Sequence, residues 1–187
     1  SQHNIGSNID AVNQLLNLEN TDVMMGVLPF FHSFGYTGTM WLPACFAPKA
    51  VYHFNPLDAK IIGKLSEKHK TTILMATPTF LKTYLKRIEK EQFADLDLVV
   101  VGAEKMPLDL AEEFFQKFGV RPSEGYGTTE LSPVAAVNIP DHRTADMHQK
   151  GTKLGTVGRP LPGVAAKVVN PDTWEDLGIG HEGLLLI

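Results

Sequence analysis

Short apolar runs alternate with amphipathic segments along most of this chain. Four runs are rich in β-branched and long aliphatic side chains and are bounded by turn residues, at 23–28, 50–54, 72–76 and 98–101. Runs of this length and composition are typical of buried strands. We therefore predict four central strands, followed by a weaker fifth one at 118–120.

The amphipathic segments predict helices. The chain opens on apolar residues at helical spacing over 1–18, and three further segments begin at Asp58, Pro78 and Pro107. Asp can cap a helix, Pro suits its first turn, and Gly119 fits the end of the third segment. Residues 33–46 are apolar nearly all round, so we predict a buried helix there.

Strands that alternate with helices indicate βαβ units. The predicted fold class is therefore α/β, with a parallel sheet flanked by helices. From residue 141 the pattern changes to a polar stretch, then glycines and prolines, and then strand-like runs at 164–169 and 184–187. We expect an α/β subdomain at 1–140, followed at 141–187 by the truncated start of a β-rich subdomain.

Composition narrows the class of protein. The net charge of -4 over 187 residues disfavours nucleic acid as a partner, because broad phosphate binding needs clustered Lys and Arg. The single Cys45 excludes an internal disulfide framework and a multi-Cys metal site, and it favours a reducing, cytoplasmic setting. No apolar run is long enough to span a bilayer. Membrane association, for example at a bacterial inner membrane, is expected only through parts of a longer parent protein.

The densest group of chemical side chains is the segment 124–130, which contains an aromatic ring, two glycines, two threonines and two glutamates. Such a mixture suits a nucleotide loop, because a ring can face a base and hydroxyls can donate to phosphate. Glu130 can hold Mg²⁺. The alternative is a Gly-rich turn in which Tyr126 packs and Glu130 is solvated.

Further candidates follow other predicted strands. In open α/β sheets, ligands bind beyond the carboxyl ends of the strands, so His32, residues 102–105 and the segment 124–130 are expected at one rim. Structural alternatives stay open for each of them. His32 can be a packing or capping residue, Gly102 can let a helix pack closely, and Glu104 can stabilise a helix N-terminus.

Four motifs carry a family resemblance, at 28–35, 102–105, 125–130 and 155–163. They occur in order and resemble those of the adenylate-forming (AMP-binding) enzymes, which include acyl-CoA synthetases, luciferases and peptide-synthetase adenylation domains. The resemblance covers nearly the whole chain. More narrowly, residues 103–105, 117–121 and 124–140 are similar to the synthetase part of bacterial acyl-ACP synthetase / 2-acylglycerophosphoethanolamine acyltransferases.

This resemblance implies an ATP- and Mg²⁺-dependent acid–thiol ligase that forms acyl-AMP and then a thioester, with CoA or acyl carrier protein as the thiol acceptor. It implies that Tyr126 stacks on adenine, that Glu124 lies near the adenine amino group and that Glu130 coordinates Mg²⁺. His32 and Phe34 would border the acyl pocket. The implied catalytic residues are His32, Thr129 and Glu130, and the implied nucleotide-binding residues are Gly102, Ala103, Glu104, Glu124, Gly125, Tyr126, Gly127, Thr128 and Thr129.

One difference from the peptide-synthetase pattern bears on the substrate class. Peptide-synthetase domains usually place an Asp after the Phe of the first motif, whereas His32 follows Phe31 here. A buried ammonium without a partner is costly, so amino acids are disfavoured and the apolar neighbourhood favours a fatty acid. The alternatives are a ligase for an aromatic or luciferin-like acid, and a non-catalytic nucleotide-binding module.

The family pattern also includes parts that this sequence lacks. Its Gly-rich phosphate loop should precede residue 1, and its ribose-binding Asp, hinge Arg and catalytic Lys should follow residue 187. The chain also lacks an initiating Met and ends inside the strand-like run 184–187. We therefore expect a fragment that is inactive on its own.

Overall fold

The computed structural model describes residues 1–46, 48–143 and 151–187. Its strands are β1 Val23–Gly26, β2 Lys49–Tyr52, β3 Ile73–Ala76, β4 Leu98–Val101, β5 Ser123–Gly127, β6 Val134–Val137, β7 Arg159–Pro160, β8 Lys167–Val169 and β9 Leu184–Leu186. Its helices are α1 Gln2–Leu16, η1 Gly35–Trp41, α2 Leu42–Phe46, α3 Ala59–His69, α4 Pro78–Arg87, η2 Lys90–Phe93, α5 Leu108–Phe118, η3 Thr129–Leu131 and η4 Asp141–Arg143. None of the helices within these ranges is long and apolar enough to cross a membrane.

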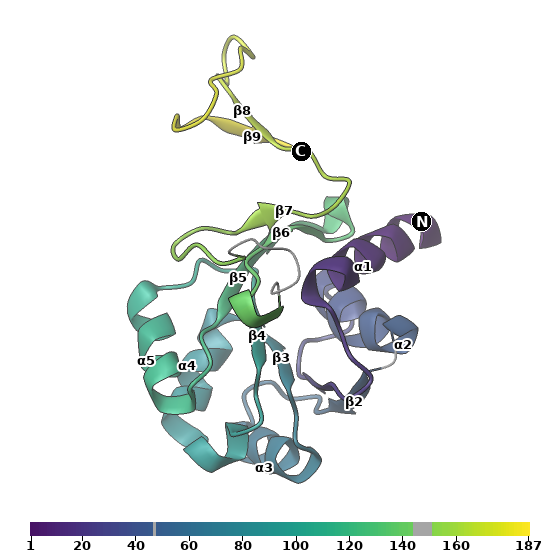
Figure 1. Ribbon diagram of the computed structural model, residues 1–187, viewed down its shortest axis with the longest axis vertical. Helices are drawn as coiled ribbons and strands as arrows, with labels where there is room; N and C mark the ends of the chain where they lie inside the picture. Colours follow the sequence, from purple (N-terminus) through teal and green to yellow (C-terminus); the bar gives the residue numbers. More distant parts are fainter. Residues whose placement is uncertain (47, 144–150) are drawn as a thin grey trace.

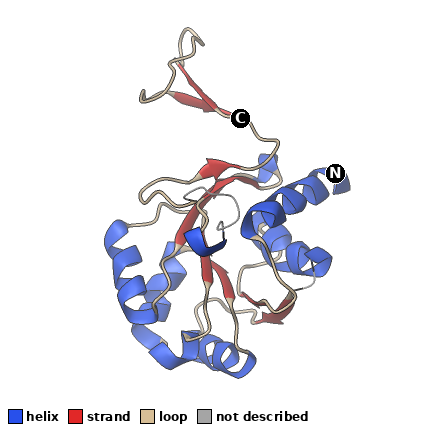
Figure 2. Cartoon of the chain, in the orientation of Figure 1, coloured by secondary structure: helices blue, strands red, loops and turns tan. Residues whose placement is uncertain are grey.

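Seven strands form one sheet in the order β2-β1-β3-β4-β5-β6-β7 (Figures 1 and 2). Strands β1 to β5 pair in parallel, and β6 and β7 are antiparallel to their neighbours. Helices lie on both sides of the sheet (Figure 1). The predicted α/β class, with a mostly parallel sheet flanked by helices, is confirmed.

Each face of the sheet carries its own apolar core. Successive side chains of a strand point to opposite faces, so Met25 packs into one core and Met24 into the other. The first core contains residues of α3, α4 and α5, such as Ile62, Leu81 and Phe114. The second core contains residues of α1 and α2. Strands β1, β3 and β4 are therefore buried on both faces, which explains their uninterrupted apolar sequences.

Most helix boundaries follow from the predicted caps. The Asp58 side chain accepts a hydrogen bond from the Ile61 N–H at 3.3 Å and starts α3. Pro78 is in the first turn of α4, as predicted. Gly119 ends α5 with a φ of 79°, in the left-handed region that glycine tolerates without a steric cost.

The segment 33–46 is only partly as predicted. It is helical, but its first part is the π-helix η1, and one side of the segment faces solvent at Trp41 and Cys45. The π-helix η1 begins at Gly35, where a Cβ would lie 2.2 Å from the Pro29 carbonyl oxygen. This close approach requires glycine. The predicted burial on all sides was wrong because the helix covers only one face of the sheet.

Strand β2 is also less buried than predicted. Lys49 and Tyr52 are exposed, and Ala50 and Val51 between them are only half-buried. The reason is topological, since β2 is the edge strand beside β1 and the sheet does not continue beyond it. An apolar run alone does not distinguish an edge strand from a central one.

The main correction concerns residues 118–130. Phe118 ends α5 instead of starting a strand, and the fifth strand is 123–127, the first part of the segment predicted as a loop. Strand propensity fails here because glycine is a weak strand former. Pairing with β4 and β6 decides the conformation, and a Cβ on Gly127 would lie 2.2 Å from the Pro133 carbonyl oxygen. Strands β6 and β7 were not predicted.

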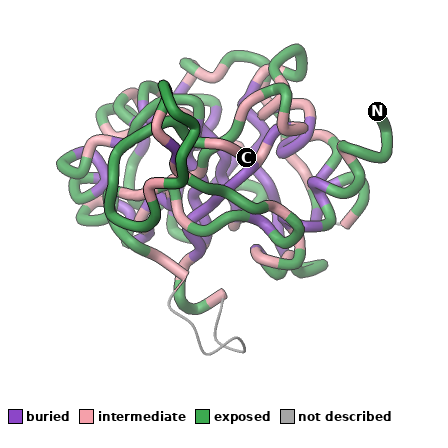
Figure 3. Tube along the Cα trace, turned by 90° about the horizontal axis from the view of Figure 1, so that it is seen from above, coloured by how far each residue is buried: buried purple, intermediate pink, exposed green. Residues whose placement is uncertain are grey.

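Residues beyond the large sheet form a separate two-stranded hairpin, β8 and β9. The hairpin extends away from the sheet at the C-terminal end (Figure 1), and most of its residues are exposed (Figure 3). The predicted strand 164–169 is shorter than expected, because only 167–169 pair. The subdomain boundary at 140 stays a prediction, since β7 lies beyond it and still pairs with the sheet. The predicted polar stretch at 142–153 lies partly outside the described residues.

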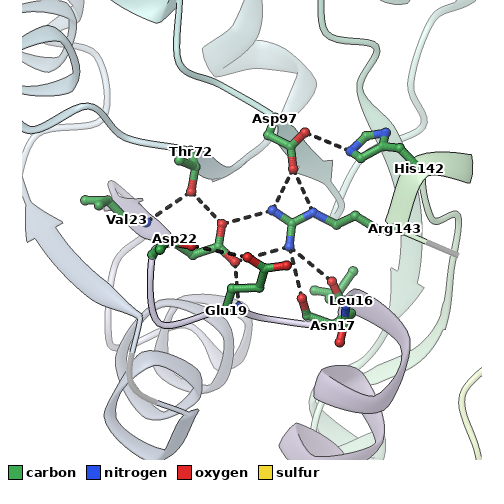
Figure 4. Close-up of polar contacts among 10 residues, drawn as sticks. Leu16, Asn17, Glu19, Asp22, Val23, Thr72, Asp97, His142 and Arg143 are labelled. Atoms are coloured by element: carbon green, nitrogen blue, oxygen red, sulfur yellow. Dashed lines mark hydrogen bonds and ion pairs between the residues drawn. The ribbon is translucent and has the colours of Figure 1, made fainter. Parts of the chain in front are cut away.

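Hydrogen bonds and ion pairs connect the segments at the amino ends of the central strands (Figure 4). Arg143 donates to Asp22, which precedes β1, at 2.9 Å from Nη2 and 3.2 Å from Nη1. Its Nε donates to Asp97, which precedes β4, at 2.8 Å, and its Nη1 donates to the Leu16 carbonyl at the end of α1. The Thr72 hydroxyl, before β3, also donates to Asp22. This network lies at the opposite ends of the strands from the predicted site.

Candidate functional site

A cavity of about 240 Å³ lies at the carboxyl ends of β1 and β4 and beside β5. Its lining comes from three of the four motifs, from β4, and from β6 with the residue before it: His32, Ser33, Phe34, Val100, Val101, Gly102, Ala103, Gly125, Tyr126, Gly127, Thr128, Thr129, Pro133, Val134 and Val137. The structure therefore brings together side chains that are far apart in the sequence. They meet at the rim where parallel sheets bind ligands.

A second cavity, of about 390 Å³, borders Tyr126 as well. It is lined by Ala103, Glu104, Lys105, Glu124, Gly125, Tyr126, Gly127, Gly155, Thr156 and Val157. The fourth motif enters the site here through 155–157. Tyr126 belongs to both linings and is 37% exposed, so its ring is accessible between the two cavities.

Two glutamates of the second cavity are held by hydrogen bonds. The Glu124 carboxylate accepts from the Met106 N–H at 3.2 Å, which fixes the connection between β4 and α5. The Glu104 carboxylate accepts from the Thr79 hydroxyl at 2.7 Å, in the first turn of α4. Glu104 thus joins two neighbouring strand–helix connections. Sequence reasoning did not identify Thr79 as its partner.

His32 has the capping contact that the sequence left open. Its Nδ1 accepts from the Phe34 N–H at 3.2 Å, at the start of the helical segment. An accepting Nδ1 implies that a neutral His32 carries its proton on Nε2. The side chain is exposed and also lines the first cavity, so capping and a role at the site are compatible.

Phe34 forms the apolar floor of the first cavity. A Cβ on Gly102 would lie 3.3 Å from the Phe34 ring, so glycine at 102 lets the ring pack against the end of β4. Phe34 also lines a small, wholly apolar cavity of about 30 Å³ beneath it, together with residues of α1 such as Ile9 and Val12. Apolar surface therefore continues from the rim toward α1.

The turn that carries Thr129 and Glu130 is the short helix η3. Glu130 is exposed and does not line either cavity. Within the described residues, no group of three or more His, Cys, Asp and Glu side chains could hold a metal ion. A metal at Glu130 would therefore find at most one further His, Cys, Asp or Glu ligand in the part of the chain that the structure describes.

A buried asparagine of α1 forms hydrogen bonds with this turn and with the start of β6. Asn8 of α1 donates to the Val134 carbonyl at 2.7 Å and to the Leu131 carbonyl at 3.4 Å, and it accepts from the Val134 N–H at 3.2 Å. Sequence reasoning missed this residue. The available signal was a polar side chain one helical turn from Ile5 and Val12, on the apolar face of the first helix.

Ser33 connects the first motif to the third. Its Oγ lies 3.0 Å from the Thr129 Oγ1, although the two residues are 96 positions apart in the sequence. Ser33 lies within the motif at 28–35, but it was not among the predicted site residues. Its contact with Thr129 depends on the fold and could not be derived from spacing.

Ala103 has an unusual backbone conformation for a residue with a side chain. Its φ is 66°, it stands two residues after the end of β4, and it lines both cavities. A left-handed conformation costs a non-glycine residue roughly 1–2 kcal/mol. Strain of this kind is concentrated at functional sites, where the surrounding structure maintains it.

Comparisons with known proteins agree with this geometry. The chain is 29% identical over 195 residues to the probable 4-coumarate–CoA ligase 1 of Dictyostelium discoideum, covering 100% of this chain and 33% of that protein. It is 27% identical to the long-chain-fatty-acid–CoA ligase of Bacillus subtilis, covering 84% of this chain and 27% of that protein. The ATP-bound crystal structure of MatB from Rhodopseudomonas palustris matches with a TM-score of 0.84 at 27% identity, covering 99% of this chain and 35% of that one.

The chain spans about a third of the length of the curated relatives that it matches most fully. These similarities extend along the sheet and both cavities. The family model described as AMP-binding enzyme matches residues 1–187, and this protein therefore belongs to the AMP-binding enzyme family.

Proposed function

We propose that this chain is part of an ATP-dependent acid–thiol ligase. The observation that carries the proposal is the convergence of three motifs on the cavity beside Tyr126, in a chain of the AMP-binding family. In the first step, a carboxylate oxygen of the acid attacks the α-phosphorus of ATP, and pyrophosphate leaves. In the second step, a thiolate sulfur attacks the acyl carbon, and AMP leaves.

The two cavities suit the two substrates. The larger one adjoins Tyr126, Glu104 and Glu124, which offer a ring face for a base and carboxylates for an amino group. The smaller one is lined by Phe34 and valines and suits the acid. In this arrangement Tyr126 stacks on adenine, with Gly102, Ala103 and Glu104 on the opposite side of the base.

Thr129 and Glu130 would act on the phosphates. The Thr129 hydroxyl lines the first cavity and can donate to an α-phosphate oxygen. Glu130 is an exposed carboxylate beside it, and Mg²⁺ is commonly held by one or two carboxylates together with substrate phosphates and water. The donor set therefore fits an ion that arrives with the nucleotide and neutralises phosphate charge.

The acid that we propose is a fatty acid. The first cavity offers no carboxylate among its lining residues that could pair with a substrate ammonium, and its floor is apolar. The small apolar cavity beneath Phe34 extends that surface toward α1. An aromatic acid is the second candidate, because one of the relatives is a probable 4-coumarate–CoA ligase.

The relatives carry CoA ligase names, which supports CoA as the thiol acceptor. The narrower similarity to acyl-ACP synthetases, with acyl carrier protein as the acceptor, stays a prediction. Since the chain covers only a third of its relatives, the activity is proposed for a longer protein that contains it, and the piece alone is expected to be inactive.

The test is ATP–pyrophosphate exchange by the full-length protein with fatty, aromatic and amino acids. Exchange driven by fatty acids would support the proposal as stated, and exchange driven only by aromatic acids would select the second candidate. A folded, Mg²⁺-supplied protein that exchanges with no acid but binds ATP would indicate a non-catalytic nucleotide-binding module.

A further inference from the structure

We propose that Ser33 is a positioning residue that directs the hydroxyl proton of Thr129 into the first cavity. The inference rests on the proposed function, because it assigns Thr129 an anionic ligand oxygen as its acceptor. The observation that carries it is the Ser33 Oγ to Thr129 Oγ1 distance of 3.0 Å, between two residues that both line the cavity.

Both hydroxyls are presented by fixed turns. Ser33 follows a turn in which the His32 N–H donates to the Pro29 carbonyl at 3.1 Å, and it is the first residue of the helical segment capped by His32. On the other side, the Thr128 N–H donates to the Pro133 carbonyl at 2.9 Å, which closes the turn around Thr129. The pair therefore joins two separately supported connections across the cavity.

The direction of the hydrogen bond decides what Thr129 can do. A hydroxyl has one proton and two acceptor lone pairs. If Thr129 donates to Ser33, its only proton is used within the protein. If Ser33 donates to Thr129, the Thr129 oxygen accepts and its own proton is available to a ligand.

A phosphate oxygen in the cavity selects the second arrangement. The proton order then runs from Ser33 to Thr129 and from Thr129 to the anion, and consecutive hydrogen bonds of this kind strengthen one another. Ser33 does not touch the anion in this arrangement. Ser33 contributes by donating its proton to the Thr129 oxygen, so that the Thr129 proton is not used in a hydrogen bond within the protein.

Ser33 also connects the two regions of the proposed site, one assigned to the acid and the other to the phosphates. Its neighbours His32 and Phe34 line the part of the cavity assigned to the acid, whereas Thr129 belongs to the turn assigned to the phosphates. A hydrogen bond between the two keeps their spacing constant. Loss of the Ser33 hydroxyl should therefore affect the adenylation step more than the folding of either turn.

The experiment is a double-mutant cycle in the full-length protein, read by ATP–pyrophosphate exchange with a saturating acid. Ser33→Ala should lower kcat/KM for ATP about 10-fold, the effect of one productive hydrogen bond, with most of the loss in kcat. Ser33→Thr keeps the hydroxyl and should retain activity within about 2-fold of wild type. Ser7→Ala, at an exposed position of α1, is the matched control and should change nothing.

The cycle separates positioning from a general structural effect. In a Thr129→Val background, Ser33→Ala should lower kcat/KM for ATP little further, because the hydroxyl that Ser33 positions is already gone. Ser33→Ala activity equal to wild type, or the same loss with and without Thr129, would overturn the inference and leave the proposed function intact. The thermal midpoint should stay constant in both Ser33 variants. If the midpoint falls in Ser33→Ala and in Ser33→Thr, and activity falls with it, the loss comes from misfolding, which would also contradict the inference.

Failure of the proposed function gives a different result. If wild type binds ATP without exchange, the same cycle is read as ATP affinity by calorimetry, and additive losses would overturn the inference. If wild type neither exchanges nor binds ATP, both the proposed function and the role of Ser33 are wrong.

Discussion

Arg143 and Asp22 form a two-point ion pair at the amino ends of the central strands. The Nη2 to Oδ1 distance is 2.9 Å and the Nη1 to Oδ2 distance is 3.2 Å, and the two side chains are only 9% and 6% exposed. A pair this well buried is stabilising only while both members are present, because either charge alone is left without compensation. The same arginine also holds Asp97 and the end of α1, so one side chain joins three parts of the fold.

Replacement of Arg143 should therefore lower the stability of the fold. We expect Arg143→Met to lower the free energy of unfolding by about 3–5 kcal/mol, the usual effect of leaving a buried charge unpaired. The measurement is urea unfolding at neutral pH. Arg121→Met is the matched control, because Arg121 pairs with the exposed Glu112 and its loss should hardly move the midpoint. Equal effects of the two substitutions would contradict the assigned role.

The same pair predicts how stability depends on pH. Burial raises the pKa of Asp22, but hydrogen bonds from Arg143, the Glu19 N–H and Thr72 outweigh it, so the pKa lies below its ordinary value of 3.8. The stabilising contribution is thus fully present above pH 3.8 and is lost as the pH falls through the lowered folded-state value.

Asp22→Asn should consequently be less stable than wild type at neutral pH, and the difference should shrink as the pH falls below 3.8. The measurement is the unfolding midpoint across the acid range. Asp172→Asn, at an exposed turn, serves as the control and should leave the pH profile unchanged. A constant difference between Asp22→Asn and wild type at every pH would show that Asp22 does not titrate as stated.

Asn8 should stabilise the turn that carries Thr129. Asn8→Ala leaves the partly buried N–H and C=O of Val134 without their Asn8 partner, which should cost about 1–3 kcal/mol of stability. ATP–pyrophosphate exchange should also fall, since the turn is released from α1. Gln14→Ala, on the exposed side of the same helix, is the control for helix propensity. Stability and exchange like wild type in Asn8→Ala would exclude this role.

Tyr126 is expected to bind adenine through its ring. Tyr126→Ala should raise the ATP Kd about 10-fold, because stacking of a base on an aromatic ring contributes roughly 1–3 kcal/mol. Tyr126→Phe keeps the ring and should bind ATP like wild type. Calorimetry with the full-length protein measures both. Unchanged ATP affinity in Tyr126→Ala, with the fold intact, would count against stacking.

Glu130 is expected to act on the phosphates without contributing to the fold. In the full-length protein, Glu130→Ala should reduce exchange by about 100-fold or more, as removal of one charge-stabilising group does in other active sites. Its thermal midpoint should stay near that of wild type, because the side chain is exposed. Glu113→Ala, on the exposed face of α5, is the control. Near-wild-type exchange by Glu130→Ala would remove Glu130 from the metal role.

Several elements could be predicted because their signals are local. The runs of β1, β3 and β4 are buried on both faces, so their uninterrupted apolar composition marks them as strands. The starts of α3 and α4 are encoded by Asp58 and Pro78, which act on the backbone within one turn. The rim that gathers His32, Gly102 and Tyr126 then follows from the parallel topology.

Other features have no local signal. Strand β5 consists largely of the motif residues 124–127, and its conformation depends on pairing with β4 and β6. The exposure of β2 depends on its place at the edge of the sheet. Neither pairing order nor edge position is encoded in a run of a few residues, because both are relations between distant segments.

The sequence by itself thus determined the α/β class, the main helices and the motifs that carry the proposed chemistry. Only the tertiary structure decided which residues support those motifs. Asn8 reaches the Thr129 turn from α1, Ser33 reaches Thr129 across the cavity, and Arg143 closes the opposite end of the sheet. Each is a polar contact between segments far apart in the chain. Propensity and periodicity report only on a residue's near neighbours, so such contacts become visible only when the fold brings their partners within hydrogen-bonding distance.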